Sequence, residues 1–295
     1  MELFTAFLFG LLAMVCYGIS NFTVQPLTRE LPGPVIVFYR NALLSSIIFI
    51  FLILFSVFQV APYYLSLKYI LIGLGVSLLG YIPYLTLVRA LKVGTLGVII
   101  PVTNTTLVFA VLFSFIFLGE VLSLSSGIAI LIIFIGLILV SVKSFSKFSC
   151  DAETLLSPGV PIALFTSLMW GIMFTLWKIP AMGLGPMLSA FVLEFGLFLY
   201  AGIHLKIKRI PLPHLTRTQW KRLFTMGIST GIATPAVMFG MQAGPGAVNL
   251  LAALTYSQSA VVALLAHWFR NERLLLRQYL GIAILIGGMF LLMMV

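Results

Sequence analysis

Apolar runs of about 20 residues recur along the whole chain, and short polar or Gly/Pro-rich segments separate them. A helix of about 20 apolar residues crosses the hydrocarbon core of a bilayer, so each run is long enough to span it. Turn signals such as Leu-Pro-Gly-Pro at 31–34 and Gly-Pro-Gly at 244–246 mark ends of the runs. The pattern predicts an all-α integral membrane protein with ten transmembrane helices, at Leu3–Val24, Val35–Val57, Leu67–Leu87, Thr95–Leu118, Leu122–Val142, Val160–Ile179, Met187–Leu205, Trp220–Met241, Ala247–Phe269 and Leu274–Met294.

The composition supports this class and excludes others. Of the 295 residues, 61% are hydrophobic and 8% are charged, and the mean hydropathy is +1.18. A soluble domain has about 45–50% apolar and about 25% charged residues. Two cysteines, Cys16 and Cys150, provide neither a disulfide framework nor a metal-ligand spacing. Residues 1–25 carry Glu2 in place of a basic start, so we interpret their apolar run as the first membrane helix and not as a cleavable signal peptide.

The chain repeats itself with an offset of 152 residues. GIAIL at 127–131 also recurs at 281–285, after an insertion of two residues. We therefore divide the chain into a first repeat at 1–145, a linker at 146–158 and a second repeat at 159–295. The matched positions include Gly33-Pro34 with Gly185-Pro186, Gly75 with Gly227, Ser77 with Ser229, Pro83 with Pro235, Thr103 with Thr255 and Glu120 with Glu272.

Each repeat has five predicted spans, and because five is odd the second repeat enters the bilayer from the opposite side. Such inverted repeats are the architecture of many secondary transporters, whose substrate site lies near the midplane between the halves. The residue inventory argues against an enzyme, because no cluster of His, Asp and Glu offers a metal site or an acid–base pair within the spans. No phosphate-binding Gly-x-x-x-x-Gly-Lys motif occurs either. We predict alternating-access transport of a small polar metabolite, without metal or cofactor.

The distribution of Lys and Arg predicts the orientation in the membrane. Of the 17 basic residues, 14 lie on the side that holds the loops after the first, third, fifth, seventh and ninth spans, and the others are Lys68, Lys178 and Arg40. The positive-inside rule places that basic side in the cytoplasm and both termini outside it. The same loops account for the net charge of +10, so we expect the lipid bilayer and not nucleic acid as a partner.

Arg40 and Glu194 are the two clear cases of ionisable residues at membrane depth. A charge at this depth costs about 2.5–3.5 kcal/mol on insertion scales, which marks both residues as functional candidates. Arg40 is near enough to the basic side to extend to lipid headgroups. Glu194 is deeper, and four alternatives stay open for it: holding a coupling proton, binding a cationic group, pairing with Arg40, or being a neutral hydrogen-bonded carboxyl without a transport role.

Two further spans bring polar runs to matching depth. One contains Thr103 and Asn104, and its counterpart contains Tyr256 and Gln258. Because amide side chains would leave several groups unpaired in lipid, we predict that they face a watery cavity and bind the substrate. The alternative is that they only join helices by hydrogen bonds.

Prolines and aromatic residues complete the set of candidates. Pro83 and Pro235 occupy equivalent positions in the two repeats and predict kinked helices that gate the site. Tyr17 and Trp170 lie in the middle of corresponding spans, where they either stack on a substrate or fill a helix interface.

The sequence resembles a known family in several segments. The stretch VIIPVTNTTLVFAVLFSFIFLGEVLSLSSGIAILIIFIGLILVS at 98–141, with its Pro, Gly-Glu and Gly spacing, is similar to the second part of an EamA domain. FYRN at 38–41 resembles the arginine near the start of the second helix in that family, and FRNERLLLRQYLGIAILIGG at 269–288 keeps the Glu and Gly of the second copy. The drug/metabolite transporter superfamily carries two such domains.

The resemblance implies ten helices and a cavity lined by the first, third, fourth, sixth, eighth and ninth. On this chain the implied substrate-binding residues are Tyr17, Asn21, Tyr81, Tyr84, Asn104, Trp170, Tyr256 and Gln258. Glu120 and Glu272 resemble structural glutamates at helix ends. Substrates of the family include amino acids, nucleotide sugars and purines.

Two questions stay open at this point. Bacterial amino-acid exporters of this type keep both termini in the cytoplasm, whereas the Lys and Arg distribution of this chain predicts the reverse, and we follow the distribution. A flippase for a lipid or a lipid-linked precursor, built on the same fold, is the alternative function, and an integral membrane enzyme is the more distant one.

Overall fold

The computed structural model describes residues 2–58, 62–93, 99, 102–120, 122–141, 159–270 and 275–294. The predicted linker at 146–158, most of residues 94–101 and Glu272 lie outside these residues. No strand occurs in the described part of the chain. Its helices are α1 (Glu2–Glu30), α2 (Gly33–Val57), α3 (Leu67–Val93), α5 (Thr106–Leu118), α6 (Leu124–Ser141), α8 (Gly159–Leu176), α9 (Lys178–Leu184), α10 (Pro186–Ile207), α11 (Arg217–Met241), α12 (Ala247–Tyr256), α13 (Gln258–Arg270) and α14 (Leu276–Met294).

The helices have the length and composition of membrane spans. Within the described residues, seven apolar segments are long enough to cross a bilayer, and shorter apolar helices lie at Thr106–Leu118, Leu124–Leu139 and Leu276–Leu291. Each of these ten segments corresponds to one predicted span. The predicted class, an all-α multi-pass membrane protein, is confirmed.

Two helices extend about six residues further than predicted. α1 continues through Pro26 to Glu30, although proline removes one backbone donor from a helix. The extension is stabilised by packing, since Leu27 is fully buried in a cluster with Leu223 and Met226 of α11. α3 likewise continues to Val93, because Ala90 packs in a buried cluster that is separate from the cluster of Leu27.

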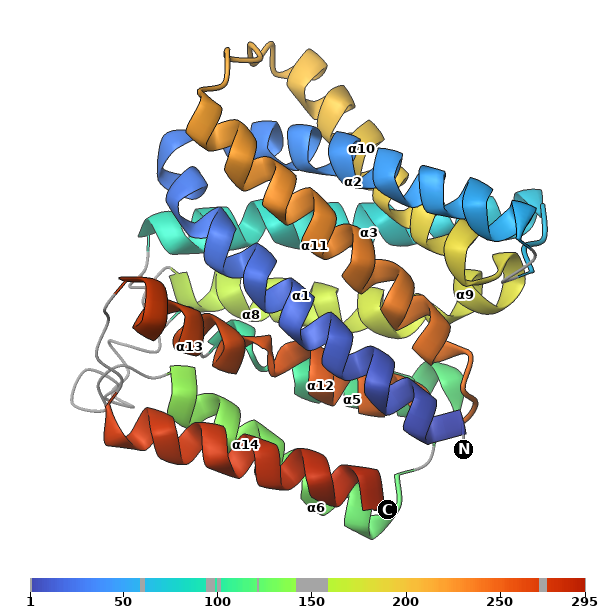
Figure 1. The fold of residues 1–295 in the computed structure, drawn as a ribbon, viewed down its shortest axis with the longest axis vertical. Coiled ribbons are helices and arrows are strands. Elements are labelled where there is room, and N and C mark those ends of the chain that lie inside the picture. Colours follow the sequence, from blue (N-terminus) through green and yellow to red (C-terminus); the bar gives the residue numbers. More distant parts are fainter. Residues whose placement is uncertain are drawn as a thin grey trace.

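The contacts between helices repeat under exchange of the two halves. α1 lies against α11, and its counterpart α8 lies against α3. α1 also contacts α12 and α13, while α8 contacts α5. Figure 1 shows α1 and α11 crossing the middle of the molecule, between the α2–α10 pair and the α6–α14 pair. This exchange of equivalent contacts is what two inverted repeats produce.

Two pairs join each helix to its own counterpart. In α2 and α10, Phe38 stacks near Phe198 and Phe49 near Phe191, so the residue numbers of the two helices run in opposite directions. In α6 and α14, Gly136 lies beside Leu285, and Gly288 beside Ile133. Both pairs are therefore antiparallel. Because each helix packs against its own counterpart, each pair lies at the pseudo-two-fold axis that relates the repeats.

Equivalent glycines allow close approach in the two halves. A Cβ added to Gly18 of α1 would lie 2.5 Å from the Val261 Cβ atom of α13. A Cβ added to Gly171 of α8 would lie 2.5 Å from the Phe109 Cβ atom of α5. Small residues permit such backbone approach in membrane bundles. A glycine of each half thus allows the same kind of close contact with a helix of the other half.

We predict that Gly136→Ala destabilises the fold, whereas Gly127→Ala in the same helix does not. A Cβ at position 136 would lie 2.8 Å from the backbone oxygen of Gly281 and 2.8 Å from the backbone nitrogen of Leu285. Overpacking of this kind costs about 1–3 kcal/mol. No atom lies within 4 Å of a Cβ at position 127, and alanine favours a helix over glycine by about 0.5–1 kcal/mol. Thermal unfolding in detergent compares the two variants, and equal midpoints would contradict this account of the α6–α14 contact.

Candidate functional site

Glu194 lies in the interior of the bundle and is held by two other helices. Its side chain belongs to α10 and only 3% of the residue is exposed. Thr234 of α11 donates its hydroxyl to Oε1 at 2.6 Å. The Asn41 amide of α2 donates to Oε2 at 2.8 Å and also lies 3.1 Å from the Glu194 backbone oxygen. Both carboxyl oxygens therefore accept hydrogen bonds from uncharged groups.

The hydrogen-bonded chain continues to the first helix. The Tyr17 hydroxyl of α1 lies 3.0 Å from the Thr234 hydroxyl. A hydroxyl group has one proton, and Thr234 gives its proton to Glu194, so Tyr17 must donate in this bond. The result is a directed chain from Tyr17 through Thr234 to Glu194 that connects three helices from both repeats.

Arg40 does not pair with Glu194 in this structure. Among the described residues no ion pair or hydrogen bond joins the two side chains, although Arg40 is close enough to Tyr17 and Tyr84 to interact with them electrostatically. Arg40 shares the inward face of α2 with buried Gly33, Val37 and Leu44, at helical spacing.

Asn21 and Gln258 form a second polar contact between α1 and α13. The Asn21 amide donates to Gln258 Oε1 at 2.8 Å. Asn21 is exposed even though it lies one turn from Tyr17 on the face of α1 that contacts the bundle, opposite to exposed Leu12. An exposed amide on an inward face indicates an opening between helices rather than contact with lipid.

The two predicted polar runs coincide with breaks in their helices. Asn104 and Thr105 form a turn before α5 begins at Thr106, and Ser257 separates α12 from α13. Since 105 and 257 differ by the repeat offset of 152, the breaks are equivalent. The predicted span Ala247–Phe269 is found with the same bounds, but Ser257 divides it into α12 and α13.

Hydroxyl groups satisfy the backbone at both breaks. The Ser257 hydroxyl donates to the Ala253 oxygen at 2.7 Å. Around the first break, the hydroxyls of Thr105 and Ser167 both donate to the Val102 oxygen, at 2.7 and 2.9 Å. The Thr106 hydroxyl donates to the Thr103 oxygen at 2.6 Å. Serine and threonine thus replace the lost helical hydrogen bonds, as broken membrane helices require.

The remaining predicted residues are distributed over the same helices. Tyr81 is buried and its hydroxyl has no partner, and Tyr84 packs in the same cluster. Trp170 of α8 packs partly buried against the main core. Pro83 and Pro235 lie inside α3 and α11, which both continue past them.

One described cavity lies away from most of these residues. It has a volume of about 310 Å³ and opens between α1, α11 and α13 on the side of the basic loops, where Phe22, Thr23, Pro26, Arg222 and Phe269 line it. Arg222 is already paired with Glu30 at 3.0 Å. Hydrogen bonds from Gln219 and Arg222 lower the pKa of the Glu30 carboxyl at this exposed end of α1. The cavity therefore lies beside the residues that follow Asn21 in α1, at the end of the bundle with the basic loops, and it is not a closed midplane site.

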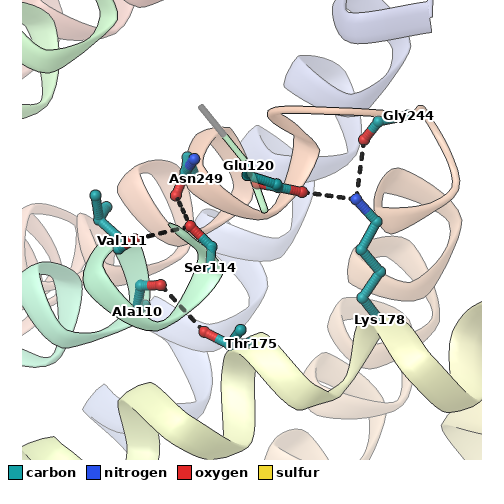
Figure 2. Close-up of polar contacts among 8 residues, drawn as sticks. All are labelled: Ala110, Val111, Ser114, Glu120, Thr175, Lys178, Gly244 and Asn249. Atoms are coloured by element: carbon teal, nitrogen blue, oxygen red, sulfur yellow. Dashed lines mark hydrogen bonds and ion pairs between the residues drawn. The ribbon is translucent and has the colours of Figure 1, made fainter. Parts of the chain in front are cut away.

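At the opposite end of the bundle, an ion pair that the sequence did not predict joins the two repeats. Lys178 of α9 lies 2.6 Å from Glu120, which follows α5, and donates to the Gly244 oxygen at 3.2 Å. Figure 2 shows the Lys178 ammonium between these two groups. Nearby, the hydroxyl of Ser114 donates to Asn249 Oδ1, which joins α5 to α12. This end therefore connects the first repeat to the second at two points.

Sequence reasoning missed Asn41, Lys178 and the pairing role of Glu120. A signal for Asn41 existed, since Asn41 and Glu194 are 153 positions apart, within one residue of the repeat offset. Residues near a pseudo-two-fold axis face their own counterparts, so a polar residue at 41 or 42 was the partner to seek. No group of His, Cys, Asp and Glu in the described residues is able to hold a metal ion.

Together, the antiparallel self-pairs and exchanged contacts define a membrane protein of two inverted helical repeats. The EamA-like transporter family model matches residues 4–142 and 157–294, so the chain belongs to that family. A solved structure described as "Crystal structure of protein" is similar in fold, with a TM-score of 0.75 and 19% identity over 97% of this chain and 95% of that chain. No curated protein matches the sequence.

Proposed function

We propose that this chain is a secondary transporter that carries a small polar metabolite, such as an amino acid or a related compound, by alternating access. The observation that supports it best is the pair of equivalent helix breaks at Thr105 and Ser257. Discontinuous helices at matching depth in inverted repeats form substrate sites in transporters, because their free backbone groups and side chains face a cavity.

The two ends of the bundle differ in a way that suits alternating access. The end with Lys178 and Glu120 is held shut by charged and polar contacts between the repeats. At the other end, Asn21 is exposed and the cavity beside Phe22 opens. With the basic loops in the cytoplasm, the closed end would face outward and the mouth inward. Rocking of one repeat against the other would exchange these roles.

Glu194 is our candidate for coupling transport to protons. Uptake of a proton on Oε1 would make Glu194 the donor to Thr234, whose own proton would then turn toward Tyr17. Tyr17 on α1 interacts electrostatically with Glu194, and also with Arg40 on α2 and Cys16 on α1. A change of protonation would thus alter hydrogen bonds that join α1 of the first repeat to α10 and α11 of the second.

Counterflow in proteoliposomes tests the proposed function. Vesicles preloaded with a pooled metabolite mixture would be offered labelled amino acids, nucleosides or sugars. We expect accumulation of one class, and a loss of about tenfold or more with Asn104→Ala, since a lost hydrogen bond to substrate costs about 1–2 kcal/mol. Ser46→Ala is the matched control, because Ser46 is exposed on α2 and bonds only within its own helix.

Three results would contradict the proposal. Absence of accumulation from every pool with folded wild-type protein would overturn it. Net movement of labelled lipid between leaflets would favour the flippase instead. Covalent conversion of a pool component would favour an enzyme.

A further inference from the structure

We propose that Arg40 is the recognition site for a single carboxylate group on the transported solute. The inference rests on the proposed function and names the chemical class of its substrate. It starts from the position of Arg40 in α2 and from the lack of an acidic partner for its charge.

The inward face of α2 directs Arg40 into the bundle. Gly33, Val37, Leu44 and Ile48 are spaced at three to four residues around Arg40 and are buried, with Val37, Leu44 and Ile48 no more than 1% exposed. Arg40 itself keeps intermediate exposure. Its neighbours on the same face are buried in the bundle, so the partial exposure of Arg40 lies on the side of α2 that faces other helices.

The charge of Arg40 lacks a counterion. Its Nε atom is shielded and has no hydrogen-bond partner, and in the described part of the chain no carboxylate lies within ion-pair distance of the side chain. Glu194 accepts its described side-chain hydrogen bonds from Asn41 and Thr234, and none of them comes from Arg40. A guanidinium without a counterion at this depth is energetically costly. Such residues in membrane spans usually have a function.

The surroundings of Arg40 complete an anion site. Tyr84 is close enough to Arg40 to interact with it electrostatically and carries a hydroxyl donor, whereas the nearby Tyr17 hydroxyl already donates to Thr234. Tyr81, one turn from Tyr84, keeps a buried hydroxyl without a partner. A planar guanidinium with neighbouring hydroxyls matches the two oxygens of a carboxylate.

The charge count favours a carboxylate over a phosphate. Arg40 is the described cation on the inward face of α2, whereas Lys178 is paired with Glu120, Lys68 lies near the start of α3 and Arg277 near the start of α14. One guanidinium balances one negative charge. A phosphate monoester carries close to two at neutral pH and would leave the second uncompensated in a site that also holds Glu194.

Comparing the exchange rates of amino acids and of their amides tests the role of Arg40 independently of the proposed function. Vesicles loaded with an equal mixture of amino acids would be offered the same mixture in labelled form, and a second set would be offered the corresponding labelled amino-acid amides. We expect wild type to exchange the acids about tenfold faster or more. Arg40→Gln should slow the acids about tenfold and leave the amides unchanged, with Arg40→Lys between the two.

Each outcome decides between the two claims. Equal rates for acids and amides in wild type, or an equal loss of both in Arg40→Gln, would overturn the role of Arg40 while transport stands. Exchange of sugars or nucleosides alone would overturn the carboxylate class. Exchange of no pool would overturn the proposed function as well.

A measurement on wild-type protein covers the case in which the variants do not fold. Phenylglyoxal modifies accessible guanidinium groups, and peptide mass spectrometry reports the modification at Arg40 separately. The amino-acid mixture should slow modification of Arg40 several-fold, and the amide mixture should not. Equal rates with acids, with amides and without either would refute the assignment.

Discussion

Glu194→Gln is expected to abolish accumulation driven by a pH gradient while solute exchange continues. A glutamine amide donates one hydrogen bond and accepts another, so it would keep contact with both Asn41 and Thr234. It would imitate the protonated carboxyl permanently. The side chain is buried, and its two oxygens accept from those residues at 2.8 and 2.6 Å, so the substitution is nearly isosteric. We expect at least a tenfold loss of uphill accumulation, because removal of a side chain that transfers protons usually has effects of this size or larger.

The measurement is uptake of the solute found by counterflow, with and without an imposed pH gradient. Glu30→Gln serves as the matched control, because it removes a carboxylate that Gln219 and Arg222 keep ionised by lowering its pKa. Thr234→Val is the second test, since it cuts the chain between Tyr17 and Glu194 but keeps the carboxylate. If Glu194→Gln accumulates solute as wild type does, Glu194 is a structural carboxyl and coupling lies elsewhere.

The family, the membrane class and the repeat were accessible from the sequence because each depends on a pattern spread over many residues. Runs of about 20 apolar residues fix the spans whatever their packing. The offset that pairs Pro83 with Pro235 is likewise a property of the chain alone. These features tolerate local irregularities, so a prediction of ten spans survived errors at several helix ends.

Contacts between distant residues were harder to predict, because helix rotation and packing determine them. Arg40 and Asn41 are neighbours in sequence, yet a rotation of about 100° separates their side chains. Asn41 reaches Glu194, whereas Arg40 does not. The break at Ser257 was also hidden, because a serine that donates to its own helix is common in unbroken membrane helices. The tertiary arrangement decided both cases.

Lys178 and Glu120 illustrate the same limit at the closed end. The positive-inside distribution treats Lys178 as one charge among seventeen, and the resemblance treats Glu120 as a helix-end residue. Their partnership joins α9 of the second repeat to the segment after α5 of the first. It exists because inverted repeats bring these helix ends together. Loss of this ion pair by mutation should accordingly reduce the stability of the protein strongly.

Lys178→Met is expected to destabilise the protein by about 3–5 kcal/mol, the usual result of removing one member of a buried ion pair. The Glu120 side chain is 2% exposed, that of Lys178 is 17% exposed, and one Glu120 oxygen already lacks a partner. The variant would leave the carboxylate buried without compensation. The double variant Lys178→Met/Glu120→Gln should recover most of the loss, because neither charge then remains. Thermal unfolding in detergent measures all three proteins.

Arg222→Met provides the comparison at the open end of the bundle. It breaks the Arg222–Glu30 pair, whose side chains are 31% and 42% exposed, and should cost less than about 1 kcal/mol. If the proposed alternating access operates, Lys178→Met should also shift the protein toward the state open at the Lys178 end, because it removes a contact that joins the repeats there. Equal destabilisation by Lys178→Met and Arg222→Met, or additive losses in the double variant, would show that Lys178 and Glu120 do not act as a pair that holds the repeats together.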